Sequence, residues 1–215
     1  MQVIQETRGN YQVNVYKLDV TPTMKAQALD FATRIIRSDN QYSRLLPQQV
    51  WASHNLQLQQ RIEIQRTYVG KLGELVFLNL LTEKGKTVNV DGMFEIYQGQ
   101  RNVDAFDFKT RANSTVDIKT GFRSIHSRLL VNEQQFHNSP KNFYVGVWLN
   151  GVDDTSQSAE NKLIKLDSIT KGIVFGYAEY GFLNREDRKG NFGEGPARYH
   201  PYNRLMGIDR LINMF

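Results

Sequence analysis

Residues 105–119 have the sequence AFDFKTRANSTVDIK, in which two short stretches alternate between apolar and charged side chains. Successive side chains of a β-strand point to opposite faces, so this alternation predicts two amphipathic strands. One face would carry Phe106, Phe108, Val116 and Ile118, and the other would carry Asp107, Lys109, Asp117 and Lys119. The connection, residues 110–114, is short and polar, as the loop of a β-hairpin should be.

This hairpin would bring two carboxylates together. When it is folded symmetrically about Ala112, Asp107 lies directly across from Asp117. Like charges opposed on a sheet destabilise it, so a fold that keeps them there requires a cation. Two carboxylates with backbone oxygens are ligands that suit Mg²⁺. Asp104, which follows Val103, is the alternative candidate for the first acid.

A third acid, Glu74, lies upstream in a segment that is almost entirely apolar. Residues 67–84 leave nearly no polar face, which predicts a helix buried on most sides and ended by Gly85. An unpaired carboxylate there would be costly or would become protonated, and a metal ion or metal-bound water would compensate for its charge. Lys119 shares a strand face with Asp117, so its ammonium can orient or activate a water for attack on phosphorus.

The remaining segments predict a mixed α+β protein. Strands are expected at residues 11–20, 87–90, 94–97, 104–109, 115–120, 143–149 and 173–180. Helices are expected from residue 23 to a break at 38–40, from 47 to near 64, over 67–84 and over 131–136. This order indicates a mixed central sheet flanked by helices. We divide the chain into a mostly helical N-terminal extension, residues 1–65, and a core, residues 66–215, with a basic C-terminal loop region.

The composition favours a soluble, cytoplasmic protein with a polyanionic partner. The 215 residues carry a net charge of +5, and a positive surface attracts nucleic acid. The chain has no cysteine, which excludes disulfides, thiolate catalysis and Cys-based zinc sites, and its histidines lack zinc-binding spacing. No apolar run approaches the ~20 residues of a membrane span. The first residues lack the pattern of a signal peptide.

On Glu74, Asp107 and Asp117-Ile118-Lys119, the chain resembles the PD-(D/E)xK phosphodiesterases, whose best-known members are restriction endonucleases. Their pattern is a Glu on a helix, an Asp opening a strand, and Asp/Glu-x-Lys on its hairpin partner. The tripeptide occurs four times in this chain, but only residues 117–119 have both an acid on the preceding strand and a Glu-bearing helix upstream. The resemblance covers about residues 66–180, and Phe106 stands where many members have Pro.

The resemblance implies a restriction-endonuclease-like core and a Mg²⁺-dependent endodeoxyribonuclease, with Mn²⁺ as a substitute. Asp107, Asp117 and the Ile118 carbonyl would bind the metal. Glu74 would act through the metal shell, and Lys119 would position the attacking water. The products would carry 5′-phosphate and 3′-hydroxyl ends. Cutting a duplex needs two centres and one chain supplies one, so we expect a type II restriction-like homodimer that acts on double-stranded DNA.

Other interpretations remain open. A structure-specific nuclease, such as a junction resolvase or a mobile-element nuclease, would use the same centre. A catalytically dead DNA-binding module is a further alternative, although none of the four site residues is missing. The hairpin could also be an ordinary amphipathic one with Asp and Lys on a solvated face, which would leave Glu74 unexplained.

Basic residues outside the hairpin are candidate DNA contacts. Residues 121–128 follow the motif directly, and residues 184–204 mix basic and aromatic side chains with glycines. The candidates are Arg123, His126, Arg128, Arg188, Lys189 and Arg198. Gln134 and Gln135 lie on the next predicted helix, where some members of the family place a residue that lines the site. Solvated loops and a plain helix surface are the simpler alternatives.

Overall fold

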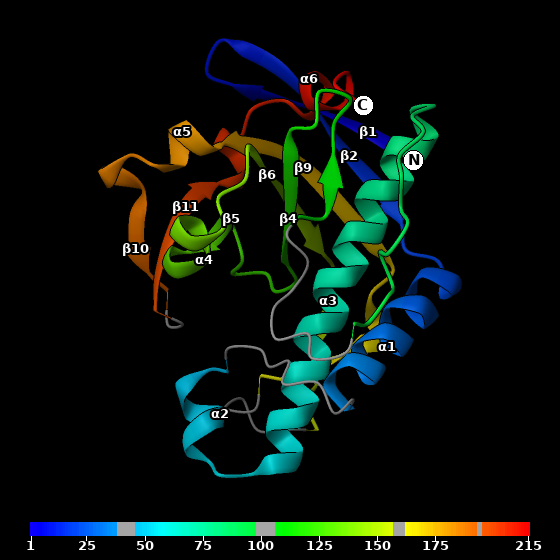
Figure 1. The fold of residues 1–215 in the computed structure, drawn as a ribbon, viewed down its shortest axis with the longest axis vertical. Helices are drawn as coiled ribbons and strands as arrows, with labels where there is room; N and C mark the ends of the chain where they lie inside the picture. Colours follow the sequence, from blue (N-terminus) through cyan, green and yellow to red (C-terminus); the bar gives the residue numbers. More distant parts are fainter. Residues whose placement is uncertain (38–45, 98–105, 157–161, 193–194) are drawn as a thin grey trace.

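The computed structural model has a mixed α+β fold, as the sequence predicts, and describes residues 1–37, 46–97, 106–156, 162–192 and 195–215. A central sheet carries helices α1 (Pro22–Arg37) and α3 (Leu56–Glu83) on one face. Its other face is covered by a smaller sheet and short helices (Figure 1). Within the described ranges, no helix combines the length and the apolar character needed to cross a bilayer.

The central sheet has the strand order β1-β2-β9-β6-β4-β3. Its strands are β1 (Gln2–Arg8), β2 (Tyr11–Asp19), β3 (Phe108–Lys109), β4 (Thr115–Gly121), β6 (Phe143–Leu149) and β9 (Lys171–Glu179). Strands β4 and β6 run parallel, and the other neighbouring pairs are antiparallel. The first residues of β4 and β6 therefore lie at the same end of the two strands.

The N-terminal residues belong to this same sheet. Strand β2, which the sequence predicts, pairs with β9, and β1, which it does not predict, forms the outer strand beside β2. The two helices predicted to end near residue 64 and to begin at residue 67 are one helix of 28 residues, α3, which follows the short α2 (Gln48–Ala52). Residues 62–69 contain no glycine or proline to interrupt it. Helix α3 thus passes through the boundary drawn at residues 65 and 66.

The predicted strands 87–90 and 94–97 are wrong, because the segment folds into local turns. The Met93 amide donates to the Val90 carbonyl at 3.1 Å, and the Glu95 amide donates to the Gly92 carbonyl at 3.0 Å. Gly92 has a φ of 82°, which favours glycine and bends the chain back on itself. These backbone groups therefore form hydrogen bonds within the segment rather than with a neighbouring strand.

One predicted strand and one predicted helix have different bounds in the structure. The strand predicted over 104–109 is Phe108–Lys109 in the described part of the chain, and residues 98–105, including Asp104, lie outside it. The helix predicted over 131–136 is α4 (Glu133–Asn138), because the Asn132 side chain caps it by accepting a hydrogen bond from the Gln135 amide. Val131 belongs to the strand before it.

A second, smaller layer lies on the sheet face opposite α3. It contains β5 (Arg128–Asn132), α4, α5 (Tyr180–Leu183), β10 (Lys189–Asn191) and β11 (Pro196–Pro201). Its sheet has the order β10-β11-β5, and its core includes Leu129, Val131 and Phe136. The remaining elements are β7 (Val152–Asp153), β8 (Ile164–Lys165), α6 (Ile208–Ile212) and the 3₁₀ turns Leu166–Ser168, Glu186–Arg188 and Tyr202–Arg204.

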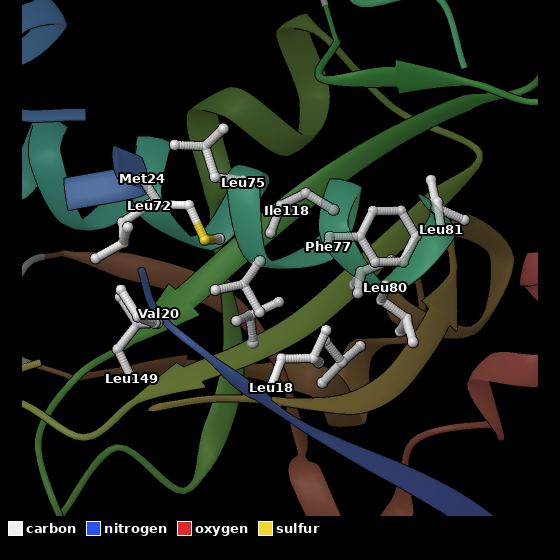
Figure 2. Packing of buried hydrophobic residues seen from close by; sticks show 14 of the residues in the cluster. Leu18, Val20, Met24, Leu72, Leu75, Phe77, Leu80, Leu81, Ile118 and Leu149 are labelled. Carbon is white, nitrogen blue, oxygen red and sulfur yellow. The ribbon is translucent and has the colours of Figure 1, made fainter. Parts of the chain in front are cut away.

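Helix α3 packs closely on β4 through the main core. Figure 2 shows Leu72, Leu75 and Phe77 of α3 in one cluster with Ile118 of β4. At Gly73 the helix backbone comes so close that a Cβ would lie 2.0 Å from Thr120 Oγ1. This position therefore requires the absence of a side chain.

We expect Gly73→Ala to lower the free energy of unfolding by about 3 kcal/mol, because the added methyl group forces α3 away from β4. Gly181→Ala is the control: a Cβ at Gly181 meets nothing within 4 Å, so stability should stay equal or rise by up to about 1 kcal/mol. Denaturant unfolding measures both. Adding Thr120→Ala should recover part of the loss at Gly73. Equal stabilities for the two single variants would contradict the close contact.

Candidate active site

The hairpin of β3 and β4 has the predicted register. Phe108 pairs with Val116 and Lys109 with Thr115, so the strands fold about Ala112. Asp107 lies at a bend just before β3, where its amide donates to the Val116 carbonyl at 3.0 Å. Its Oδ2 accepts a hydrogen bond from the Ile118 amide at 2.6 Å. The Asp107 carboxylate is therefore held against the backbone of β4.

Asp117 and Lys119 form an ion pair on the sheet face that α4 covers. Asp117 Oδ2 lies 2.7 Å from Lys119 Nζ, and Nζ donates to Gln135 Oε1 at 2.9 Å. Asp117 Oδ2 is buried, but among the described residues it accepts no well-directed hydrogen bond. It therefore interacts with Lys119 as an ion pair rather than through a directed hydrogen bond. Gln135 of α4 thus lines the site, as the resemblance allows.

Glu74 has a partner that the sequence analysis did not assign. Lys71 Nζ lies 2.6 Å from Glu74 Oε2, donates to the Met93 carbonyl at 2.9 Å, and sits 4.6 Å from the centre of the Phe31 ring. Both side chains are nearly buried, with exposed fractions of 6% for Lys71 and 14% for Glu74. The burial of Glu74 is therefore compensated by Lys71, and it does not by itself require a metal ion.

Asp107 interacts electrostatically with the two other acids of the site. Burial raises the pKa of its carboxyl well above the ordinary value of 3.8, and the nearby charges of Glu74 and Asp117 raise it further. The Ile118 amide and the Lys119 ammonium act in the opposite direction. The other three residues predicted from the sequence are thus within electrostatic reach of Asp107. In the described part of the chain, however, no three or more His, Asp or Glu side chains lie close enough together to form a metal-binding group.

Lys141 and Tyr144 also lie at this site. Tyr144 of β6 is the register partner of Asp117, and its hydroxyl accepts a hydrogen bond from the Lys141 amide at 2.9 Å. Burial lowers the pKa of the Lys141 ammonium, while the charges of Asp117 and Asp107 oppose that shift. Burial raises the pKa of Tyr144 to about 12. Only the parallel pairing of β4 with β6 places these residues here, and the sequence alone did not predict that pairing.

The three DNA-contact candidates after β4 have different environments. Arg123 is ion-paired with Asp153 and donates to the Lys162 carbonyl. His126 Nδ1 accepts hydrogen bonds from the Phe122 and Arg123 amides at 3.0 and 3.3 Å, so it holds a loop together. Arg128 is exposed.

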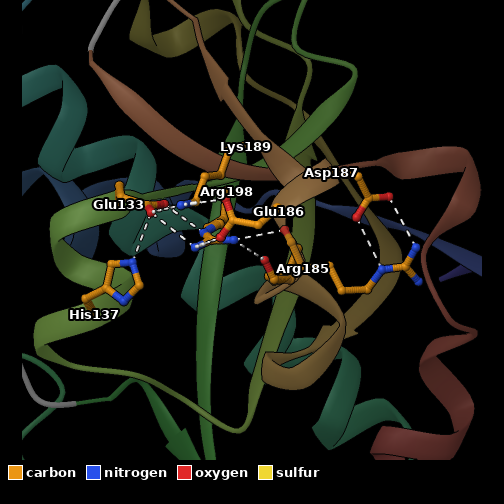
Figure 3. Close-up of polar contacts among 8 residues, drawn as sticks. Glu133, His137, Arg185, Glu186, Asp187, Lys189 and Arg198 are labelled. Atoms are coloured by element: carbon orange, nitrogen blue, oxygen red, sulfur yellow. Dashed lines mark hydrogen bonds and ion pairs between the residues drawn. The ribbon is translucent and has the colours of Figure 1, made fainter.

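Two of the candidates from residues 184–204, Lys189 and Arg198, contact Glu133 of α4 (Figure 3). Arg198 has 1% of its side chain exposed and donates to Glu133 Oε2 at 2.8 Å and to the Arg185 carbonyl at 2.9 Å. This position makes Arg198 a structural link between β11 and α4. Lys189 also reaches Glu133, at 3.4 Å, and Arg188 pairs with Asp187.

Comparison of the chain with protein-family models, with curated proteins and with solved structures gives no match in any of the three.

We expect Asp107→Asn to stabilise the metal-free protein at neutral pH. Because the pKa of Asp107 is raised in the folded state, this carboxyl's contribution to stability is present at low pH and is lost as the pH rises through the raised pKa. An amide imitates the protonated form, so at pH 7 in EDTA the melting temperature should rise by about 2–4 °C. The difference should shrink toward pH 4, which thermal melts over pH 4–8 would measure.

Mg²⁺ serves as the control in the same melts. It should raise the melting temperature of the wild-type protein, because a ligand that binds only the folded state stabilises it, and should leave the Asn variant unchanged. An Asn variant that is less stable than wild type at pH 7 without metal would contradict the electrostatic account of Asp107.

Proposed function

We propose that this chain is a Mg²⁺-dependent, cytoplasmic endodeoxyribonuclease with a restriction-endonuclease-like core. The observation that carries the proposal is the position of Asp107, whose carboxylate is held on the Ile118 amide of β4, between Asp117 and Lys119 in the chain. Glu74 of α3 is near enough for its charge to raise the pKa of Asp107. An unrelated amphipathic hairpin has no reason to place a buried carboxylate beside two others. Perturbed pKa values at clustered ionisable groups are typical of functional sites.

The donor atoms at this site are compatible with Mg²⁺. The buried Asp117 Oδ2 accepts no well-directed hydrogen bond from the described residues, and its charge is paired with the Lys119 ammonium at 2.7 Å, so a cation would share this oxygen with Lys119. Asp107 Oδ2 accepts a hydrogen bond from the amide of Ile118, the residue that follows Asp117. Carboxylate and carbonyl oxygens are the ligands that Mg²⁺ prefers, so we assign Asp107, Asp117 and the Ile118 carbonyl as its protein ligands and Glu74 as an acid of its outer shell. When bound, Mg²⁺ would activate a water and neutralise charge on the phosphate.

Lys119 is suited to orient the attacking water. An ammonium has three donors, of which Lys119 uses one for Gln135, while its charge pairs with Asp117. A remaining donor can hold a water beside the carboxylates. Gln135 restrains the flexible lysine stem, which fixes the position of that donor.

We expect Asp117→Ala and Lys119→Ala each to reduce cleavage of plasmid DNA in Mg²⁺ by at least about 100-fold, the typical effect of losing a positioned catalytic group. DNA binding in Ca²⁺ should survive, because neither residue is part of the main apolar core. Lys109→Ala is the matched control, since Lys109 belongs to the rival tripeptide Asp107-Phe108-Lys109 and is exposed. Loss of cleavage in the control, or undiminished cutting by either site variant, would contradict the assignment.

The proposed enzyme acts as a homodimer on double-stranded DNA and cuts at a short specific sequence. Incubation of the purified protein with a long phage genome and Mg²⁺ should then give a reproducible ladder of fragments. Charge alone gives only salt-sensitive, non-specific affinity, whereas discrete bands require base contacts. A smear would reject sequence specificity, and cleavage confined to branched DNA would identify a structure-specific nuclease instead.

A further inference from the structure

The smaller sheet has an outward face formed by alternate residues of its strands. Leu129 and Val131 of β5 point into the core, so Arg128 and Leu130 point away from it. Tyr199 of β11 pairs with Leu130, and Arg128 pairs with Pro201. Residues from two separate parts of the chain, which the sequence analysis treated as separate candidates, therefore share this surface.

Arg128 is held on this face by two aromatic rings. Its guanidinium carbon lies 5.2 Å from the centre of the Phe192 ring and 5.7 Å from that of the Tyr199 ring. The two rings meet edge to face, with centres 5.3 Å apart. Gly190 leaves the space for this packing, because a Cβ there would lie 2.9 Å from Phe192 Cζ. Stacking on aromatic rings fixes the plane of a guanidinium without using its hydrogen-bond donors.

The charge of Arg128 is not neutralised by any described acid. Arg123 and Arg198 are paired with Asp153 and Glu133, whereas no carboxylate in the described ranges lies within ion-pair distance of Arg128. A guanidinium that lies against aromatic rings and has open donors is suited to a phosphate, which it can bind through two parallel hydrogen bonds. Its positive charge, on a chain of net charge +5, is complementary to the backbone of DNA.

Helix α4 connects this face to the candidate active site. Strand β5 runs directly into α4, whose Gln135 accepts a hydrogen bond from Lys119. The ion pair of Glu133 with the buried Arg198 ties the same helix to β11, as Figure 3 shows. A DNA contact on β5 would therefore have a fixed position relative to Lys119.

We propose that Arg128, held on Phe192 and Tyr199, binds a backbone phosphate of DNA that flanks the cleaved bond. The contact positions the DNA and does not read its sequence. Its relation to a cleaved bond rests on the proposed nuclease function, but its binding to DNA can be measured without cleavage.

Fluorescence anisotropy with a labelled DNA duplex, in EDTA and over a series of salt concentrations, tests the contact. Arg128→Ala should weaken binding about 10-fold at low salt and reduce the slope of log K against log salt by about one. Arg128→Lys should keep the salt slope, because the charge remains, but should bind more weakly than wild type. Arg34→Ala is the matched control, since Arg34 is an exposed arginine of α1, which packs against α3, and it should change binding less than 2-fold, as surface charges away from the DNA do.

Equal binding by Arg128→Ala and Arg34→Ala would overturn the proposed contact. If the wild-type protein cleaves DNA and these two variants bind alike, the contact alone fails. If the wild-type protein binds DNA without cleaving it and Arg128→Ala still weakens binding, the nuclease function fails and the Arg128 contact stands.

Discussion

The close approach of α3 to β4 at Gly73 and Thr120 is the contact on which the candidate site depends. Both residues are next to a site residue in the chain: Gly73 directly precedes Glu74, and Thr120 directly follows Lys119. A Cβ at Gly73 would lie 2.0 Å from Thr120 Oγ1, so the backbones can meet only without a side chain there. One steric constraint thus brings the helix acid to the strand that carries Asp117 and Lys119.

Three lysines lie beside the acids of the site. Lys71 pairs with Glu74, Lys119 pairs with Asp117, and the Lys141 ammonium interacts with Asp117 and Asp107. These ammonium groups offset part of the cost of burying the acids. They also imply that binding of a divalent ion changes existing interactions. Because the pKa of Asp107 is raised, an ion that binds its carboxylate competes with a proton.

Local patterns in the sequence predicted the hairpin well, whereas features that depend on chain packing were not predicted. The alternation of residues 105–119 predicted the register about Ala112, because strand faces follow from adjacent residues. The same period-two rule failed at residues 87–97, where turns at Gly92 use the backbone groups. Lys71 was visible three residues before Glu74, but only the structure shows that both side chains are nearly buried and that Lys71 compensates the charge of Glu74. Lys141 could not be assigned without the parallel pairing of β4 and β6.

The central claim is that the carboxylates of Asp107 and Asp117 bind a divalent cation between them. Anomalous X-ray scattering from crystals soaked in Mn²⁺ tests it directly, because Mn²⁺ prefers the same oxygen ligands as Mg²⁺ and its position can be located without assumptions about the site. We expect an anomalous peak within coordination distance of both carboxylates and of the Ile118 carbonyl, with Glu74 beyond direct contact. A peak elsewhere on the protein, or Mn²⁺-soaked crystals without a peak at these residues, would contradict the claim.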